Sequence, residues 1–128
     1  MKREEIENEV LKINNYLDKC LWMEFECTRM NEGKILISGR IDISSSEFAI
    51  DIEFENPYYV ASLMSWQLDD SRSFIELLSG DDEMAANDKY QVEKGNLLFK
   101  VNAEDFNEAP IFIAAQNIKC SILIENPF

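Results

Sequence analysis

Nine residues in the first half of the chain, Glu47–Glu55, alternate between apolar and acidic side chains. On one side of an extended chain fall the apolar residues Phe48, Ile50, Ile52 and Phe54. On the other side fall Glu47, Ala49, Asp51, Glu53 and Glu55. A period of two is that of a half-buried β-strand and excludes a helix. We therefore expect one face of this strand in a core and a row of four carboxylates on the other face.

The residues around this strand predict a helix followed by a β-meander. Apolar side chains recur at spacings of three and four over 3–20, which indicates an amphipathic helix: Ile6, Val10, Ile13, Leu17 and Cys20. Two further alternating segments, 21–28 and 35–43, precede the acidic strand, with turns at Asn31-Glu32-Gly33 and Ser44-Ser45-Ser46. A lone glycine within the second segment, Gly39, indicates a bulge or close packing.

The second half of the chain is harder to interpret. Residues 58–66 are apolar on both faces of an extended chain, and we interpret them as one strand. Asp69-Asp70-Ser71 has the composition of a helix N-terminus, so a short helix is expected over 74–78 with Gly80 just beyond its end. Asp81-Asp82-Glu83 begins a further turn of helix through Asn87. Four more strands are expected at 89–93, 97–102, 111–116 and 118–125.

These elements define an α+β fold in a single globular domain, residues 1–128. An N-terminal helix packs on a mainly antiparallel sheet of about six to seven strands, with one or two short helices in the middle. A chain of this length buries enough surface to fold without a metal or a disulfide.

Charge excludes several classes of partner. The chain has 25 acidic and 12 basic residues, a formal net charge of −13. Nucleic-acid binding depends on Lys and Arg that neutralise phosphates, so we expect no nucleic-acid partner. The same charge opposes binding to anionic membranes. A basic protein partner is the class of partner that this charge favours.

The sequence contains no histidine, which removes the commonest general base and the commonest metal ligand. Asp81-Asp82-Glu83 does not fit the spacing of a calcium-binding EF-hand. We therefore expect no catalytic residues, no metal and no cofactor. The cysteines Cys20, Cys27 and Cys120 lack paired spacing and indicate buried, reduced thiols in a cytoplasmic protein. No signal peptide or membrane span is expected.

The acidic residues are concentrated in one part of the chain. Residues 41–88 contain twelve acids and a single base, Arg72, so this segment carries −11 of the net charge. Aromatic residues in the same segment are typical of interface anchors. The predicted partner-binding residues are Asp42, Glu47, Asp51, Glu53, Glu55, Tyr58, Tyr59, Trp66, Asp69, Asp70, Asp81, Asp82 and Glu83. The alternative interpretation of these acids is a solvated sheet face with acidic helix caps.

The hypothesis that follows is a non-enzymatic binding protein, either a monomer or a homodimer, whose acidic surface docks a basic partner. Its most specific form is an intracellular inhibitor of the immunity type, which neutralises a cationic toxin. A small acidic secretion chaperone for an effector is a second hypothesis, which the N-terminal helix and the strands after it suit. A third is a small enzyme or ligand-binding domain with its site on the sheet.

Overall fold

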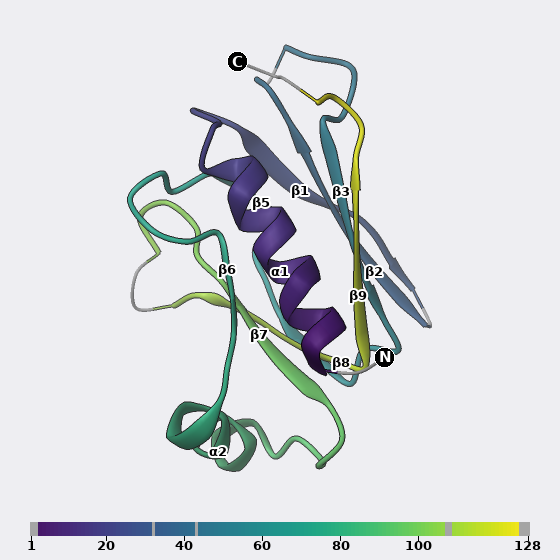
Figure 1. Cartoon of the computed structure of the whole chain (residues 1–128), viewed down its shortest axis with the longest axis vertical. Helices are drawn as coiled ribbons and strands as arrows, with labels where there is room; N and C mark the ends of the chain where they lie inside the picture. The colour runs from purple at the N-terminus through teal and green to yellow at the C-terminus, as the bar shows by residue number, and fades with distance from the viewer. Residues whose placement is uncertain (1–2, 32, 43, 107–108, 126–128) are drawn as a thin grey trace.

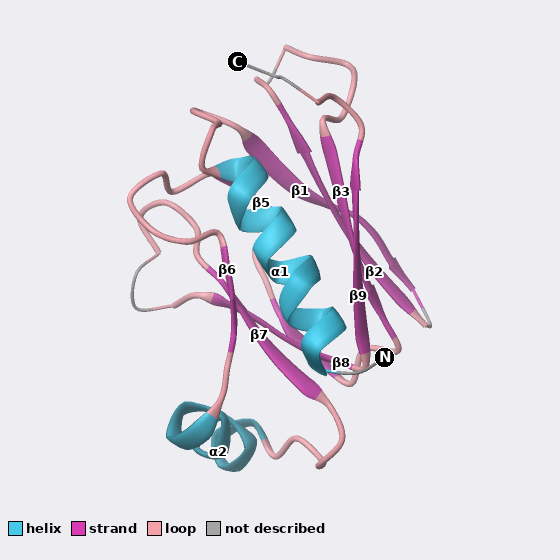
Figure 2. Cartoon of the chain, in the orientation of Figure 1, coloured by secondary structure: helices cyan, strands magenta, loops and turns pink. Residues whose placement is uncertain are grey.

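The computed structural model describes residues 3–31, 33–42, 44–106 and 109–125. In this part of the chain, two helices and nine strands form an α+β fold with two antiparallel sheets (Figures 1 and 2). The α+β class, the N-terminal helix and the antiparallel pairing are confirmed. The prediction of one sheet with six to seven strands is wrong, because the chain divides its strands between two sheets. Glu32 and Ile43, which the sequence assigned to a turn and a strand, lie outside the described residues.

Sheet A has the strand order β5-β1-β2-β3-β9. Its strands are β5 (Ser65–Gln67), β1 (Glu24–Asn31), β2 (Lys34–Arg40), β3 (Ile50–Glu55) and β9 (Asn117–Ile122). The acidic strand β3 lies inside this sheet, paired with β2 on one side and β9 on the other. Its residues alternate between buried and half-buried, as the sequence period requires.

Sheet B has the strand order β4-β8-β7-β6. Its strands are β4 (Tyr59–Ala61), β8 (Ile111–Ala115), β7 (Leu97–Val101) and β6 (Ile75–Leu77). Helix α1 (Arg3–Leu17) contacts β9 and β6, the edge strands of the two sheets, and lies between the sheets in Figure 1. Helix α1 thereby closes one open side of the two-sheet assembly. No helix of the described residues has the length and apolar content needed to cross a membrane.

The main core lies between the two sheets and α1. Its largest buried side chains include Phe25 and Phe54 of sheet A, which contact Phe74 and Phe99 at ring-centroid distances of 4.5 and 5.3 Å. Burial of each such side chain contributes roughly 1.5–3 kcal/mol to folding. A smaller cluster lies outside sheet B beneath helix α2 (Gly80–Tyr90): Ala86, Val92, Leu98, Phe112 and Ala114.

Gly39 confirms the prediction of close packing. A Cβ atom at this position would lie 2.5 Å from Cε1 of Phe25, the residue opposite it on β1. Only a residue without a side chain lets the Phe25 ring approach β2 this closely.

Two predictions in the middle of the chain are wrong. Residues 75–77 form edge strand β6, where the sequence predicted a helix over 74–78. Asp69 accepts a hydrogen bond from the Ser71 amide two residues on, at 3.0 Å, which makes a turn and caps no helix. Residues 75–77 pair with β7 instead. Residues 58–66 form two strands in different sheets, β4 and β5, instead of one.

The predicted helical turn at residues 81–87 is confirmed and is longer than expected. Helix α2 runs from Gly80 to Tyr90, so the strand predicted at 89–93 is absent and β7 pairs with β6 and β8. Phe48, predicted on the core side of the acidic strand, precedes β3 and lies half-buried under the Arg40 guanidinium, 4.5 Å from the ring centroid.

Candidate functional site

Three carboxylates on the outward face of sheet A lie against cations of neighbouring strands. The N–O distances are 3.3 Å for Lys34–Glu53, 2.9 Å for Lys119–Glu55 and 2.7 Å for Arg40–Glu26. The hydrogen bond from Lys119 holds the pKa of Glu55 below its ordinary value. The acidic row of β3 is therefore largely compensated within the sheet, since its cations come from β2 and β9.

Asp51 completes this network through neutral partners. The Ser38 hydroxyl donates to Asp51 Oδ1 at 2.7 Å, and Ser38 in turn lies 2.9 Å from the Thr28 hydroxyl. Such half-exposed contacts contribute about 0–1 kcal/mol each, so the network organises the sheet face more than it stabilises it.

The other predicted binding residues are dispersed over the molecule. Asp42 accepts hydrogen bonds from Ser44 in a turn, which lowers the pKa of Asp42. Glu47 is exposed, and the acids Asp81, Asp82 and Glu83 form the first turn of α2.

The three predicted aromatic anchors differ in exposure. Trp66 is only 5% exposed and stacks on Phe25 in the core, so it does not reach the surface. Tyr59 packs on Tyr90 and Phe112 outside sheet B, whereas Tyr58 is 48% exposed.

The structure brings together a different acidic surface, formed by residues 18–22, 68–72 and 103–106, which we call the three-loop surface. Backbone hydrogen bonds join the loops: Leu68 N donates to Met23 O at 2.9 Å, and Glu104 N donates to Gln67 O at 3.1 Å. The Arg72 guanidinium donates to Ala103 O at 3.2 Å. Segments that are about fifty and thirty residues apart in sequence thus share one surface.

The three-loop surface combines acidic charge with exposed apolar side chains. It contains five acids against two bases, Lys19 and Arg72: Asp18, Asp69, Asp70, Glu104 and Asp105. Its exposed apolar residues are Leu21 (44%), Trp22 (76%) and Phe106 (40%). Exposed aromatic residues beside unpaired charge are typical of protein-binding surfaces.

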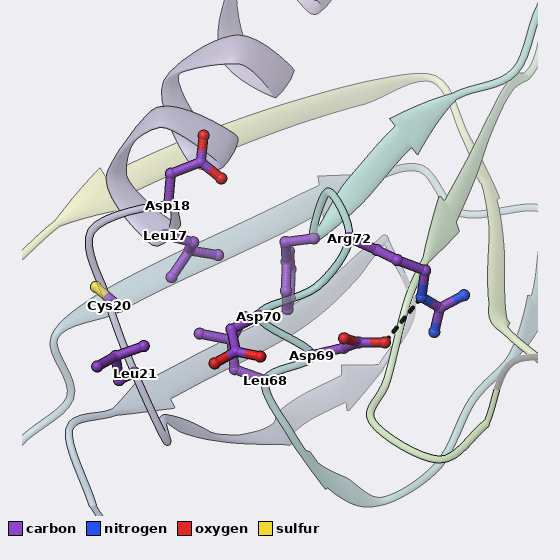
Figure 3. A pocket seen from close by; sticks show the side chains of 9 residues that line it. Leu17, Asp18, Cys20, Leu21, Leu68, Asp69, Asp70 and Arg72 are labelled. Carbon is purple, nitrogen blue, oxygen red and sulfur yellow. Dashed lines mark hydrogen bonds and ion pairs between the residues drawn. The ribbon is translucent and has the colours of Figure 1, made fainter.

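A cavity of about 200 Å³ lies within this surface, between the end of α1 and the loop from β5 to β6 (Figure 3). Figure 3 shows Asp18 at the end of α1 and Asp70 on the facing loop, with the Asp69 carboxylate directed to Arg72. Asp69 is 8% exposed, accepts from Arg72 Nε at 2.8 Å, and has a pKa lowered first by the Ser71 hydroxyl. Asp18 and Asp70 form no ion pair with any described residue.

The backbone of this surface is strained at Trp22, whose φ of +57° lies in the left-handed region that a bulky side chain disfavours. Asp105 has φ +67°, which aspartate tolerates. The left-handed conformation costs roughly 1–2 kcal/mol per residue, and such strain is concentrated at functional sites.

The one thiol of the cavity is not suited to nucleophilic chemistry. Burial raises the pKa of Cys20 to about 11, and its Sγ donates to Tyr16 O at 3.4 Å. A thiol that stays protonated near neutral pH is a poor nucleophile, so the cavity favours non-covalent binding.

Sequence reasoning missed most of the three-loop surface. Asp18, Glu104 and Asp105 lie outside the acidic segment 41–88, and only the tertiary structure brings their loops together with the loop of Asp70. The available signal was Leu21-Trp22, two large apolar residues directly after the predicted helix. Comparisons with protein-family models, curated proteins and solved structures found no match to this chain.

Proposed function

We propose that this chain is a non-enzymatic binding protein that docks a basic protein partner on its three-loop surface. The observation that carries the proposal is Trp22, 76% exposed and held in a left-handed conformation. It directly follows Leu21, which lines a cavity whose carboxylates, Asp18 and Asp70, lack cationic partners among the described residues. An Arg or Lys side chain of the partner enters the cavity, and Trp22 covers its aliphatic stem.

The more specific form of the proposal is an intracellular inhibitor that covers a positively charged active site, such as that of a cationic toxin. The net charge of −13 supports this form, because a strong negative field accelerates association with a basic protein. The three free cysteines support a reducing compartment.

A capture experiment with matched variants tests the proposal. The immobilised protein is exposed to lysate of its source cells in low salt, alongside the variant Asp18→Asn/Asp70→Asn and the control Glu47→Gln/Glu93→Gln. Both variants lose two negative charges, but only the first loses them at the cavity. We expect the wild type and the control to retain the same basic protein and the cavity variant to lose it.

Salt gives the second arm of this experiment. Binding through unpaired surface carboxylates weakens steeply as ionic strength rises, because the Debye length falls from about 10 Å at 0.1 M to about 3 Å at 1 M. Equal loss of capture in both variants would show that net charge alone directs binding. Capture that does not change with salt concentration would contradict an electrostatic binding surface.

A further inference from the structure

A second cavity, of about 330 Å³, lies between α2 and the outward face of sheet B. Figure 2 shows α2 at the end of the molecule opposite the chain's C-terminus. The cavity has an aromatic side, formed by Phe112 of β8 and Tyr90 of α2, whose rings stack at a centroid distance of 4.3 Å. Its remaining apolar lining is Leu78, Ala85, Ala86 and Pro110.

The cavity lies where α2 presents the small side chains Ala85, which is exposed, and Ala86, which is buried. Ala86 is buried against sheet B and Ala85 lines the cavity, whereas the larger Met84 is 66% exposed. A helix that only packs on a sheet turns its large apolar residues inward and leaves few voids. Helix α2 turns one large residue inward, Tyr90 at its end, and presents alanine to the sheet before it, which leaves a space beside the two aromatic rings.

Charged side chains of both signs line the same cavity: Glu76, Asp82, Lys89 and Lys100. Lys100 Nζ lies 3.9 Å from Glu76 Oε2, beyond hydrogen-bond distance, and that oxygen accepts from Asn102 at 2.8 Å. Asp82 forms no ion pair with any described residue. An ammonium group and a carboxylate are thus both available to a ligand.

We propose that the α2 cavity binds a small aromatic zwitterion with the chemistry of a free aromatic amino acid. The ring of the ligand packs on Phe112 and Tyr90, its carboxylate accepts from Lys100, and its ammonium group pairs with Asp82. A ligand without net charge is not repelled by a protein of charge −13. The cavity volume lies at the lower end of small-molecule sites, which are typically about 300–1,000 Å³.

Calorimetric titration with four probes tests the ligand class. L-phenylalanine has the ring and both charges, 3-phenylpropionate lacks the ammonium group, phenethylamine lacks the carboxylate, and L-alanine lacks the ring. We expect L-phenylalanine to bind and each singly charged analogue to bind about tenfold or more weakly, the usual effect of losing a charged hydrogen bond. L-alanine should show no heat of binding.

Two variants and a control locate the site. Ala85→Leu should fill the cavity and abolish binding of L-phenylalanine, whereas Met84→Leu on the opposite face of α2 should leave it unchanged. Lys100→Met should remove the preference for L-phenylalanine over phenethylamine even if Ala85→Leu fails to fold. The proposal is overturned if the wild type does not bind L-phenylalanine, if the three aromatic probes bind equally, or if a folded Ala85→Leu binds as the wild type does.

Discussion

The side chain of Asn14 on α1 pairs with the backbone of Ile75 on β6 as a neighbouring strand would. Asn14 Nδ2 donates to Ile75 O at 2.9 Å, and Ile75 N donates to Asn14 Oδ1 at 3.1 Å. An unpaired strand edge invites association with other chains, and a single amide here satisfies both backbone groups of Ile75 at that edge. The helix therefore supplies hydrogen bonds to the β6 edge of sheet B as well as covering the core.

Asn14→Ala should destabilise the protein by about 1–3 kcal/mol, because it leaves a partly buried amide and carbonyl of β6 without partners. Urea denaturation measures the loss as a lower midpoint at constant slope. Asn15→Ala is the matched control, since Asn15 is exposed on the same helix. An equal loss in both variants would attribute the effect to the helix and not to the edge of β6.

The Asp69 carboxylate should contribute stability that depends on pH. Its pKa in the folded protein lies below the ordinary value because of hydrogen bonds from Ser71 and Arg72, so its contribution is complete above the unfolded pKa of about 3.9 and is lost as pH falls through the lower folded value. Asp69→Asn should therefore cost about 1–3 kcal/mol at pH 7.

The difference between wild type and Asp69→Asn should narrow as the pH falls below 4, measured by urea denaturation at a series of pH values. Asp70→Asn should change stability by less than about 0.5 kcal/mol, because that neighbouring carboxylate is exposed. A difference for Asp69→Asn that stays constant with pH would contradict the depressed pKa.

Gly39→Ala should destabilise the protein by about 1–3 kcal/mol, because the new methyl group would overlap the Phe25 ring. Phe25→Leu in the same chain should relieve the overlap, so the two changes together should cost less than the sum of the separate costs. A double-mutant cycle by thermal or urea unfolding measures this coupling. Additive losses in the free energy of unfolding would show that there is no steric conflict between the two positions.

Trp22→Gly should separate stability from binding on the three-loop surface. Release of the left-handed strain, roughly 1–2 kcal/mol, offsets the chain entropy that glycine adds to the unfolded state, about 0.5–1 kcal/mol. Stability should thus be unchanged or slightly higher, whereas affinity for the captured basic partner should fall. Unfolding curves and a binding titration of the same preparation measure both effects. Unchanged affinity for the basic partner would show that Trp22 is not part of the interface.

The sequence predicts the elements whose period is unambiguous. The apolar stripe of α1 and the alternation in β3 and β9 reflect burial on one face. Such a pattern can be recognised from residues that are close together in the sequence. The apolar residues of the segment Phe74–Leu78 have spacings that suit either a helix or a strand. The strand that forms depends on pairing with β7 and on Asn14, both distant in sequence.

The charges at the candidate site likewise depend on contacts between residues that are distant in sequence. A count along residues 41–88 finds one base, but Lys34 and Lys119 lie outside this segment and pair with Glu53 and Glu55 across neighbouring strands. Strand pairing thus compensates acids that the sequence singled out, such as Glu53 and Glu55. Loop packing gathers Asp18 and Asp105, which the sequence did not single out, on the same surface as Asp70, which it did. The thirteen predicted binding residues stay a prediction, with Asp69 and Asp70 on the three-loop surface.

The most direct test of a basic-partner surface is an NMR titration of the ¹⁵N-labelled protein with a short arginine-rich peptide in low salt. The account predicts amide shift changes concentrated in residues 18–22, 68–72 and 103–106, with little change along β2, β3 and β9. Shifts centred on the outward face of sheet A, or spread evenly over the molecule, would contradict it.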